Sequence, residues 1–450
     1  MRTRIERGWV ATMDNELRVY TDGTVILEDN LITYVGPSSE APGDQAERTI
    51  DAQGKIVLPG LINTHVHLSQ QLGRGIGDDV SLLTWLHERI WPYESSMTYE
   101  DSHISSLLCG IELIRTGVTC FAEAGGQHVA AMAEAMEELG LRGILARSIM
   151  DEGEGPAAMI EPTDQCIARQ QDLIDRFHGS VNGRLRVWPA CRTIFNCSDA
   201  LYLQTKELAD RAGVGIHAHI AEIPDEVEFS RQTRGDTTVA HLENLGVLAP
   251  NFLSVHTVWL TEQELDILAK RDVPVSHNPA AAMRVLGFAD VPGMLDRGIL
   301  VALGTDGAPS NNRMNLISEM YLAGLIHKGR KLDPKVVPAE AVLGMVTNKA
   351  AKALLWDDEI GSLEVGTRAD VTIINPQTAG MLPLHDPVAN LVYAMDTTNV
   401  WTVIVDGRVL FEDGVIQTVD EQSVLAEAEA RAAELIQRAG IRLPHRFPQT

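Results

Sequence analysis

From Pro59 onward, short apolar runs alternate with amphipathic stretches whose apolar residues recur at helical spacing. Such alternation is typical of βα units around a parallel sheet. Helical stretches follow most of the apolar runs, as in "HVAAMAEAMEELG", "ALYLQTKELADRAG" and "TEQELDILAKRD". The eight candidate strands are Leu61–His65, Val118–Glu123, Gly143–Arg147, Leu185–Ala190, Val214–His219, Leu253–His256, Val273–His277 and Ile299–Thr305. Eight βα repeats over roughly three hundred residues predict an α/β fold of the TIM type, a (β/α)8 barrel. A doubly wound open sheet is the alternative, but it rarely needs eight strands.

The two ends of the chain have a different pattern. Residues 1–57 read as short strands joined by turns, with no helical stretch between them. After residue 359, "GSLEVGTRADVTIINP" and "TNVWTVIVDGRVLFEDG" return to short strands, and the "VDG" of Val405–Gly407 is a hairpin signal. A last helical stretch, "EQSVLAEAEARAAELIQRAG", is ended by Gly440. We therefore expect residues 58–359 to form the barrel, and residues 1–57 and 360–450 to form one small composite β-sandwich with a terminal helix.

Composition argues against several classes of partner. The chain has 450 residues with 62 acidic and 37 basic side chains, a formal net charge of -25. A surface of this sign repels phosphate backbones and anionic lipid, so no nucleic-acid partner and no membrane surface is expected. No apolar run is long enough to span a bilayer, and the first residues lack the apolar core of a signal peptide. The five cysteines form no CxxC pair, which predicts reduced thiols and a cytoplasmic location.

Polar side chains collect where the predicted strands end. "GLINTHVHL" places His65 and His67 one residue apart, and alternate residues of a strand face the same side. An isolated His-x-His pair is most often chance, but six of the 14 histidines lie at such strand ends. The residues at or directly after the eight strand ends are, in order, His65 with His67, Glu123, Arg147, Arg192, His217 with His219 and Glu222, His256, His277 and Asp306. Because a TIM barrel builds its active site at the carboxyl ends of its strands, we expect these side chains to form one site.

The residue types at these ends suit one metal ion. Three neutral imidazoles and a carboxylate are ligands of zinc, and nitrogen and oxygen donors also accept iron or manganese. We predict one divalent ion, zinc first, with iron or manganese as alternatives. The predicted ligands are His65, His67, His219 and Asp306. His217, deeper in its strand, is expected to pack against the core or to support a ligand from behind. A carboxylated lysine bridging two metals is excluded, because no lysine occurs between Lys55 and Lys206.

Such a site points to hydrolysis, because a metal lowers the pKa of bound water enough for hydroxide to exist near neutral pH. Asp306 would accept the proton of that water, and His256 would orient the metal-bound hydroxide by a hydrogen bond. Glu222, three residues after a ligand, would protonate a ring nitrogen of the substrate and relay a proton to the leaving group. These are the parts needed to replace an amino group or a halide on an electron-poor sp² carbon by hydroxyl.

An ordered set of motifs extends over nearly the whole chain. The motifs are "VLPGLINTHVHL", "LLTWLHERIWPYE", "GIHAHIAE", "VSHNPAAAMRV", "LGTDGAPSNN" and "IGSLEVGTRADV". This set resembles the amidohydrolase superfamily, and within it the branch of S-adenosylhomocysteine/methylthioadenosine deaminases and triazine hydrolases. The resemblance implies the barrel with its composite β-sandwich, the same metal ligands, and the same roles for Glu222, His256 and Asp306. It also implies substrate contacts. These are Glu94, at the position expected to bind ribose hydroxyls, together with Arg147 and His277.

Two departures from the nucleoside deaminases concern the substrate. The loop "DEGEGPAAMIEPTD" has no arginine to hold an amino-acid carboxylate, and Arg192 stands where the resemblance implies a histidine. Arg192 is therefore predicted to bind a ring carbonyl or carboxylate of the substrate, with an ordinary ion pair as an equal alternative. For Glu123 two interpretations stay open, a contact with substrate and a counter-charge for Arg147.

The first hypothesis is a metal-dependent hydrolytic deaminase that acts on the C–N bond of a cyclic amidine. Its substrate would be a methylthioadenosine- or S-adenosylhomocysteine-like nucleoside, or a related purine, pterin, pyrimidine or triazine. The second is a triazine hydrolase that releases chloride or alkylamine from the same metal site. A non-catalytic scaffold of this fold is a remote third, because a scaffold would be expected to lose ligands or the proton shuttle, and none is missing. The expected partners are a small heterocyclic substrate and further copies of the chain in a homo-oligomer, as the resemblance implies.

Overall fold

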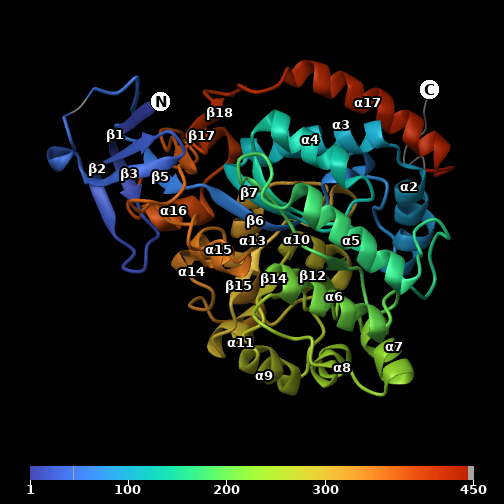
Figure 1. Ribbon diagram of the computed structural model, residues 1–450. Coiled ribbons are helices and arrows are strands. Elements are labelled where there is room, and N and C mark those ends of the chain that lie inside the picture. Colours follow the sequence, from blue (N-terminus) through green and yellow to red (C-terminus); the bar gives the residue numbers. More distant parts are fainter. Residues whose placement is uncertain (44, 444–450) are drawn as a thin grey trace, which may run out of the picture.

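The computed structural model describes residues 1–43 and 45–443, with the strands of the two chain ends gathered at one end of the molecule (Figure 1). Nine of these strands form one sheet, in the order β19-β18-β17-β16-β5-β1-β2-β3, with β4 beside β1. The nine strands are β1 (Arg2–Ala11), β2 (Val19–Glu28), β3 (Leu31–Pro37), β4 (Arg48–Asp51), β5 (Ile56–Pro59), β16 (Val371–Ile374), β17 (Val400–Val405), β18 (Arg408–Glu412) and β19 (Val415–Ile416). β16 pairs antiparallel with β5, so that Ile373 lies opposite Val57. Strands from the two chain ends thus lie in one sheet.

The predicted hairpin joins β17 to β18. Val405 lies opposite Arg408, which leaves Asp406 and Gly407 as a two-residue turn. Both turn residues have positive φ, 51° and 76°, as the favoured two-residue hairpin turn requires. A Cβ on Gly407 would lie 1.9 Å from the carbonyl oxygen of Asp29. Glycine at this position is therefore required both by the turn and by the neighbouring backbone.

All eight predicted runs of the central region form parallel strands, in two sheets. One sheet has the order β10-β8-β7-β6 and the other the order β15-β14-β13-β12-β11-β9. Their strands are β6 (Leu61–Val66), β7 (Val118–Glu123), β8 (Arg142–Leu145), β9 (Ser148–Ile149), β10 (Leu185–Val187), β11 (Ala190–Cys191), β12 (Ile216–Ile220), β13 (Phe252–His256), β14 (Val275–His277) and β15 (Val301–Leu303). The third and fourth predicted strands are each divided in two, as β8 with β9 and β10 with β11, and the sheets separate at these divisions. A parallel bridge between Val66 and Asp306 links the first strand to the last.

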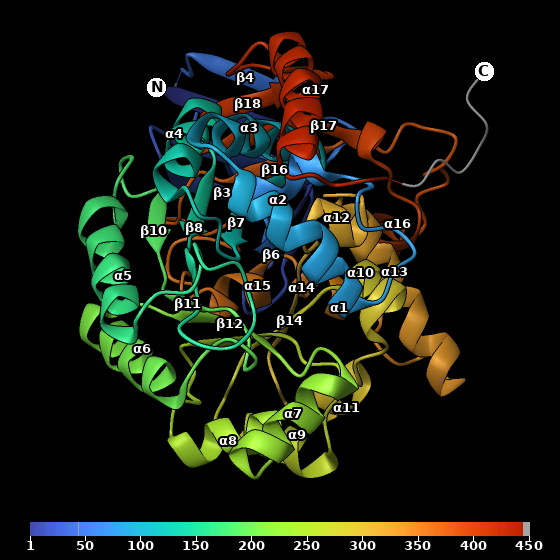
Figure 2. The ribbon, with the colours of Figure 1, turned by 90° about the vertical axis from the view of Figure 1, so that its right-hand side faces the viewer.

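Helices surround the parallel strands, with α5 and α6 on one side, α7, α8 and α9 on another, and α13 opposite α5 (Figure 2). The longer helices are α3 (Tyr99–Arg115), α4 (Val129–Leu139), α5 (Thr163–Phe177), α6 (Asp199–Ala212), α7 (Pro224–Arg234), α8 (Thr238–Leu245), α9 (Glu262–Lys270), α13 (Leu316–Lys331) and α17 (Glu421–Arg438). The shorter ones are η1 (Ser38–Glu40), η2 (Leu68–Gly73), α1 (Leu82–Trp85), η3 (Leu86–Ile90), α2 (Trp91–Ser96), α10 (Pro279–Ala281), η4 (Ala282–Leu286), α11 (Val291–Asp296), α12 (Ala308–Asn311), α14 (Ala339–Gly344), α15 (Asn348–Ala353), α16 (Pro387–Tyr393) and η5 (Thr397–Asn399). Gly140 and Gly213 end α4 and α6 in the left-handed conformation that favours glycine. None of the helices in the described part of the chain is long and apolar enough to cross a membrane.

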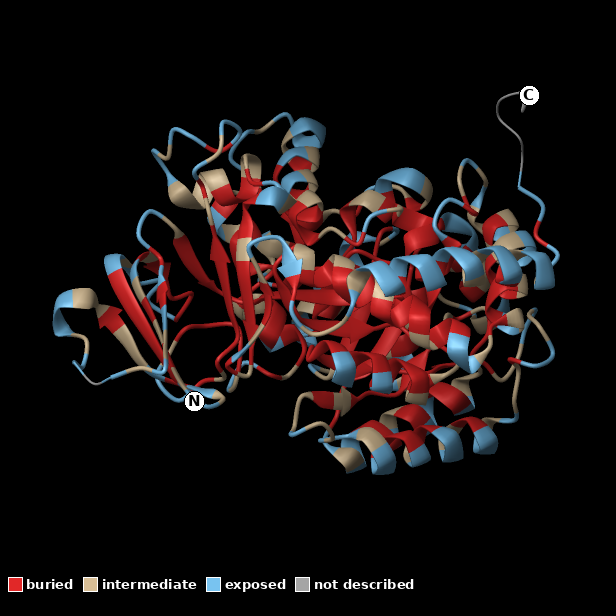
Figure 3. Ribbon diagram, turned by 90° about the horizontal axis from the view of Figure 1, so that it is seen from above, coloured by how far each residue is buried: buried red, intermediate tan, exposed pale blue. Residues whose placement is uncertain are grey.

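The parallel strands form the core of the molecule. Every residue of β6, β7, β12 and β13 is buried, and the exposed residues lie on the outer faces of the helices (Figure 3). Strands covered on both faces are apolar along their whole length, which explains why the sequence shows apolar runs here and not an alternating pattern. The few polar residues within these strands are therefore costly to bury and need a specific reason to be there.

An ionic cluster joins the parallel strands to the composite sheet. Arg142 begins β8 and is fully buried. It donates to both carboxylate oxygens of Asp370, at 2.7 and 3.1 Å, and to Asp406 at 2.7 Å. Because Asp370 precedes β16 and Asp406 lies in the β17–β18 turn, this one side chain connects three strands far apart in the sequence.

Candidate active site

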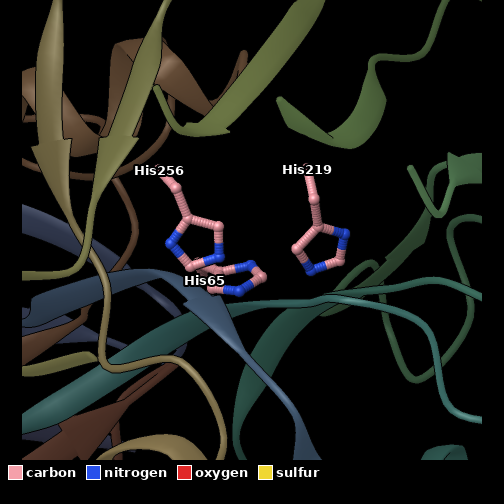
Figure 4. Close-up of side chains that lie close together, drawn as sticks. All are labelled: His65, His219 and His256. Atoms are coloured by element: carbon pink, nitrogen blue, oxygen red, sulfur yellow. The ribbon is translucent and has the colours of Figure 1, made fainter. Parts of the chain in front are cut away.

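Three imidazoles from three different strands meet at the carboxyl ends of the parallel strands. His65 comes from β6, His219 from β12 and His256 from β13, and their rings face one another (Figure 4). The ring centre of His65 lies 5.1 Å from that of His219 and 5.2 Å from that of His256. The structure thus brings together residues that are 191 positions apart in the chain, between His65 and His256.

Asp306 completes this cluster from the turn after β15. Its Oδ1 lies 3.3 Å from Nε2 of His65 and 3.4 Å from Nε2 of His67. Two sets of possible ligand atoms result, His65 with His219 and His256, and His65 with His67 and Asp306, each within 4.8 Å of one another. Nε2 of His65 is buried and has no hydrogen-bond partner. A buried nitrogen lone pair without a partner, at the centre of such donors, fits a metal ion.

The outer hydrogen bonds determine which ring nitrogens face inward. Nδ1 of His219 lies 2.8 Å from the carbonyl oxygen of Arg192 and donates to it, so Nε2 keeps its lone pair. Nδ1 of His65 lies 2.8 Å from Nε2 of His217, and when Nδ1 donates in this contact, Nε2 of His65 keeps its lone pair in the same way. The predicted supporting position of His217 agrees with this contact. His256 differs, because its Nδ1 accepts a hydrogen bond from Asn278 at 3.0 Å, so its Nε2 carries a proton. His256 therefore suits a donor role better than a ligand role.

Burial keeps these imidazoles neutral. It lowers the pKa of His65, His67 and His256 well below the ordinary value. The pKa of His219 is lowered to about 4, mainly by burial, with Asp306 acting in the opposite direction. Neutral imidazole is the form that binds a metal ion, so the site is ready for one without first losing protons.

Glu222 lies beside the imidazoles, in surroundings that favour its neutral form. Burial raises its pKa well above the ordinary value, and the nearby carboxylates of Glu226 and Asp306 raise it further. Its Oε1 lies 3.7 Å from Nε2 of His256, and its side chain reaches the same cavity. A carboxylic acid that keeps its proton near neutral pH can act as a general acid.

The backbone is in the left-handed region at several of these strand ends. Ala221, His256, Thr257 and Asp306 have φ of 52°, 69°, 48° and 62°. None of them is glycine, so each position carries conformational strain that the surrounding structure must hold. Such turns end the strands abruptly at the site. Sequence patterns did not predict this feature.

The cluster opens into a cavity at the carboxyl ends of the parallel strands. Its polar floor contains His67, His219, His256, Glu222 and Asp306, and Gln70, Arg192, Thr193, Asn196 and Ser310 also line it. The apolar wall consists of Leu82, Trp85, Leu86, Ala281, Val285 and Leu286. Trp85 is fixed by a hydrogen bond of 3.4 Å from its Nε1 to the carbonyl oxygen of Pro309. This wall, Gln70 and Asn278 were missed by sequence reasoning. The "LLTW" motif that carries Trp85 was the available signal for the wall.

The residues predicted to contact the substrate differ in whether they line the cavity. Arg192 lines the cavity and donates to Oε2 of Glu94 at 2.8 Å, while Oε1 of Glu94 accepts from Gln70 at 2.9 Å. Both oxygens of Glu94 are thus occupied, and Glu94 lies behind the residues that line the cavity. The ion pair that was the alternative interpretation of Arg192 is present in the structure, and its guanidinium still faces the cavity.

Arg147 and His277 lie outside the set of residues that line this cavity. Arg147 donates to Glu161 at 3.1 Å, and Nε2 of His277 lies 3.3 Å from Nε2 of His327. The expectation that Glu123 balances Arg147 is wrong. The carboxylate of Glu123 instead accepts the backbone N–H groups of Leu68, Gly125 and Gly126, at 2.6, 3.1 and 2.9 Å. Three amide donors satisfy it without a cation, because each can take one lone pair of the carboxylate.

The comparisons with known proteins agree with this geometry. The sequence profile of the Amidohydrolase family matches residues 56–410. The chain is 37% identical over 439 residues to the 5-methylthioadenosine/S-adenosylhomocysteine deaminase of Thermoanaerobacter pseudethanolicus, covering 97% of this chain and 100% of that one. Its structure is similar to an adenosine deaminase from Xanthomonas campestris with bound zinc, with a TM-score of 0.92, 28% identity, and 97% and 98% of the two chains covered. It is also similar to atrazine chlorohydrolase from Arthrobacter aurescens complexed with zinc, with a TM-score of 0.89, 26% identity, and 96% and 100% covered. The resemblance seen in the motifs is thereby confirmed, and the chain is a hydrolase that belongs to the amidohydrolase family.

Proposed function

We propose that the protein is a metal-dependent hydrolytic deaminase of an amino-substituted nitrogen heterocycle, with adenosine-like nucleosides as the first class of substrate. The observation that carries the proposal is the buried carboxyl group of Glu222, which lines the same cavity as His67, His219, His256 and Asp306. The deaminase of Thermoanaerobacter pseudethanolicus, named for methylthioadenosine and S-adenosylhomocysteine, supports the substrate class. The bridge between Val66 and Asp306 supports a further proposal, that the eight strands close into a (β/α)8 barrel.

The residues that would hold the metal are His65, His67, His219 and Asp306. His65 and His219 present Nε2 inward, and Oδ1 of Asp306 lies near Nε2 of both His65 and His67. Three imidazoles and one carboxylate suit zinc, which two similar solved structures contain. When bound, such an ion supplies Lewis-acid activation of a water molecule.

The other roles belong to side chains of the cavity. Glu222 holds a proton at its carboxyl group and donates it to a ring nitrogen, which makes the adjacent carbon more electrophilic. Nε2–H of His256 donates a hydrogen bond to the attacking oxygen and so orients it. Asp306 accepts the proton that the attacking water loses. A proton returned through Glu222 to the amino nitrogen then lets it leave as ammonia.

The cavity wall suits a flat ring. The apolar wall that includes Trp85 and Leu286 would exclude water from one face of such a ring, while Arg192, which also lines the cavity, offers donors. Arg192 and Glu94 together are neutral, so they favour a neutral acceptor such as a hydroxyl or carbonyl oxygen over a second carboxylate. Glu94 would bind ribose hydroxyls after Arg192 or Gln70 releases one of its oxygens. Arg147 and His277 do not line the cavity, so they would affect substrate binding indirectly, by positioning the loops around it.

Ammonia release tests this function directly. Zinc-loaded protein would be assayed with methylthioadenosine, S-adenosylhomocysteine, adenosine, guanine, pterins, cytosines and aminotriazines. We expect ammonia from one of these classes and none from protein stripped of metal by a chelator. Silence of the zinc-, iron- and manganese-loaded protein on the whole panel would refute the deaminase.

A second candidate is a triazine hydrolase that releases chloride or alkylamine. Two observations favour it. The structure matches atrazine chlorohydrolase along 96% of the chain, and the apolar wall of the cavity can pack against a triazine ring, a substrate without a sugar. Chloride or alkylamine release from chloro- and alkylaminotriazines, measured beside the ammonia panel, separates the two. The same Glu222 would protonate the triazine ring in either case.

A further inference from the structure

The chain makes a sharp turn between strand β12 and helix α7. His219 lies in the strand, and Glu222 lies three residues later in the turn. Ala221, between them, has a φ of 52°, which an alanine rarely adopts. Its carbonyl oxygen accepts the N–H groups of Val258 and Trp259, at 3.1 and 3.0 Å. The direction of the Glu222 side chain therefore depends on what holds this strained turn.

A buried carboxylate holds it from the other side. Glu226, in the first turn of α7, is 1% exposed. Its Oε1 accepts the N–H of Ala221 at 2.8 Å, and its Oε2 accepts the N–H of Glu222 at 2.7 Å. Burial raises the pKa of Glu226 to about 7, and these two N–H donors act in the opposite direction because they stabilise its charged form. Ile223, at the start of the helix, provides no side-chain cap, and the carboxyl group of Glu226 accepts the backbone N–H groups of this turn instead.

The two bonds bind two consecutive peptide groups to one rigid carboxylate. Rotation of the Ala221–Glu222 segment would break at least one of them and leave a buried carboxyl oxygen without a donor. The Glu226 carboxyl also lies close enough to Glu222 to raise the pKa of that side chain. A glutamine at 226 would have only one acceptor oxygen, and its NH2 group would face the second N–H.

We propose that Glu226 is a positioning residue for the proton shuttle: its two-point hydrogen bond to Ala221 and Glu222 holds the turn that directs the Glu222 carboxyl into the cavity. Glu226 itself touches no substrate, because it does not line the cavity. This inference rests on the proposed role of Glu222. A matched control exists in α9, where the buried Glu264 accepts the backbone N–H of Thr261 at 2.9 Å and that of Val239 at 3.2 Å and also does not line the cavity.

The test compares Glu226→Gln with Glu264→Gln in the zinc-loaded protein. Glu226→Gln should lower kcat by about 10- to 100-fold, as small misplacements of a reacting group do, with KM and metal content unchanged. It should also speed hydrogen exchange in the peptide that spans residues 216–223. Glu264→Gln should leave kcat within about twofold while costing similar stability. If Glu226→Gln does not fold, Glu226→Asp is tested instead. Aspartate keeps the carboxyl group on a side chain one methylene shorter, so kcat should again fall while KM and metal content stay unchanged.

Three outcomes would overturn the inference. Unchanged kcat in Glu226→Gln would do so, with or without faster exchange. Equal losses of kcat in the two glutamine variants would show a general effect on folding. If only KM or the metal content changed, Glu226 would act on substrate binding or on the metal site and not through Glu222. Failure of the proposed function has a different signature: the unmodified metal-loaded protein would then release no ammonia from the panel. Retained turnover in Glu222→Gln would remove the shuttle role alone, whatever Glu226→Gln does to exchange.

Discussion

Glu222 is a carboxyl group whose chemistry depends on its surroundings. It is buried beside two other acidic residues, Glu226 and Asp306, and burial is the largest cause of its raised pKa. Glutamine has the same shape but holds no transferable proton. Glu222→Gln should therefore keep the fold and the metal and lose turnover by about 10²- to 10⁴-fold, the usual contribution of a general acid. Metal analysis and ammonia release on one preparation check both parts, and a variant with near-normal turnover would remove Glu222 from the mechanism.

His219 connects the site to the pH dependence of stability. The folded, metal-free protein gives it a pKa of about 4, against about 6.5 in an unfolded chain. Between pH 6.5 and 4 the unfolded chain therefore binds a proton that the folded protein does not, so the free energy of unfolding falls as the pH falls through this window. The contribution of His219 is on the order of 3 kcal/mol.

Buried carboxyl groups act in the opposite direction and must be separated from this effect. Burial raises the pKa of Glu123 and of Glu319 to about 8, so their contributions to stability are lost as the pH rises. The useful measurement is the difference in unfolding free energy between the metal-free protein and His219→Gln, taken at pH 7 and at pH 4. This difference should shrink by about 3 kcal/mol on acidification. A constant difference would mean that His219 titrates normally.

At the scale of elements, the apolar wall of the cavity depends on how α1 packs against the backbone at Gly77. Gly77 is buried against Trp85, and a Cβ there would lie 2.2 Å from the indole ring. Gly77→Ala should displace Trp85 from the cavity and raise KM roughly tenfold, since one apolar contact in a binding pocket is worth ~1–3 kcal/mol. kcat should change little, because the catalytic side chains lie on other elements. Steady-state kinetics on the best substrate of the panel measure both.

Gly329→Ala is the matched control. Gly329 lies in α13 and a Cβ there meets no atom within 4 Å. This variant should leave KM unchanged and stabilise the helix by up to about 1 kcal/mol. Equal KM values in the two alanine variants would show that Trp85 does not form part of the substrate site.

Elements with strong periodicity were predictable, and elements that depend on distant partners were not. The stretches predicted as helices correspond to α4, α6 and α9, because their caps and apolar spacing are local in the sequence. The division of the third and fourth strands was not predicted, since the gaps at Ala146–Arg147 and Trp188–Pro189 reflect which neighbour each half pairs with. No local pattern carries that information.

The same division holds for the candidate site. His65, His67, His219 and Asp306 were found because strand ends and alternate spacing are visible in a sequence. Asn278 and Glu226 were missed because their importance lies in hydrogen bonds to His256 and to the turn at Ala221, which only the fold creates. The partners of Arg147 and Glu123 were misjudged for the same reason: both residues follow strands, but their side chains turn to different neighbours.

At the scale of the whole molecule, the composite sheet and the parallel strands are joined at the end away from the catalytic side chains. Arg142 is fully buried there between Asp370 and Asp406. Removing one partner of a buried ionic cluster leaves the others charged and without compensation. Arg142→Met should therefore lower the free energy of unfolding by about 3–5 kcal/mol, as measured by urea denaturation.

A surface arginine provides the comparison for that loss. Arg231 pairs with Glu228 at 3.0 Å on α7, and both side chains are about half exposed. Arg231→Met should change the free energy of unfolding by less than about 1 kcal/mol, because water solvates both charges in the folded and unfolded states. If the two methionine variants lose the same small amount of stability, the buried cluster does not hold the composite sheet to the parallel strands. Apolar packing, such as that of Leu58 and Ile374, must then do so instead. If Arg142→Met alone is strongly destabilised, the few charges between the two sheets are essential to their assembly.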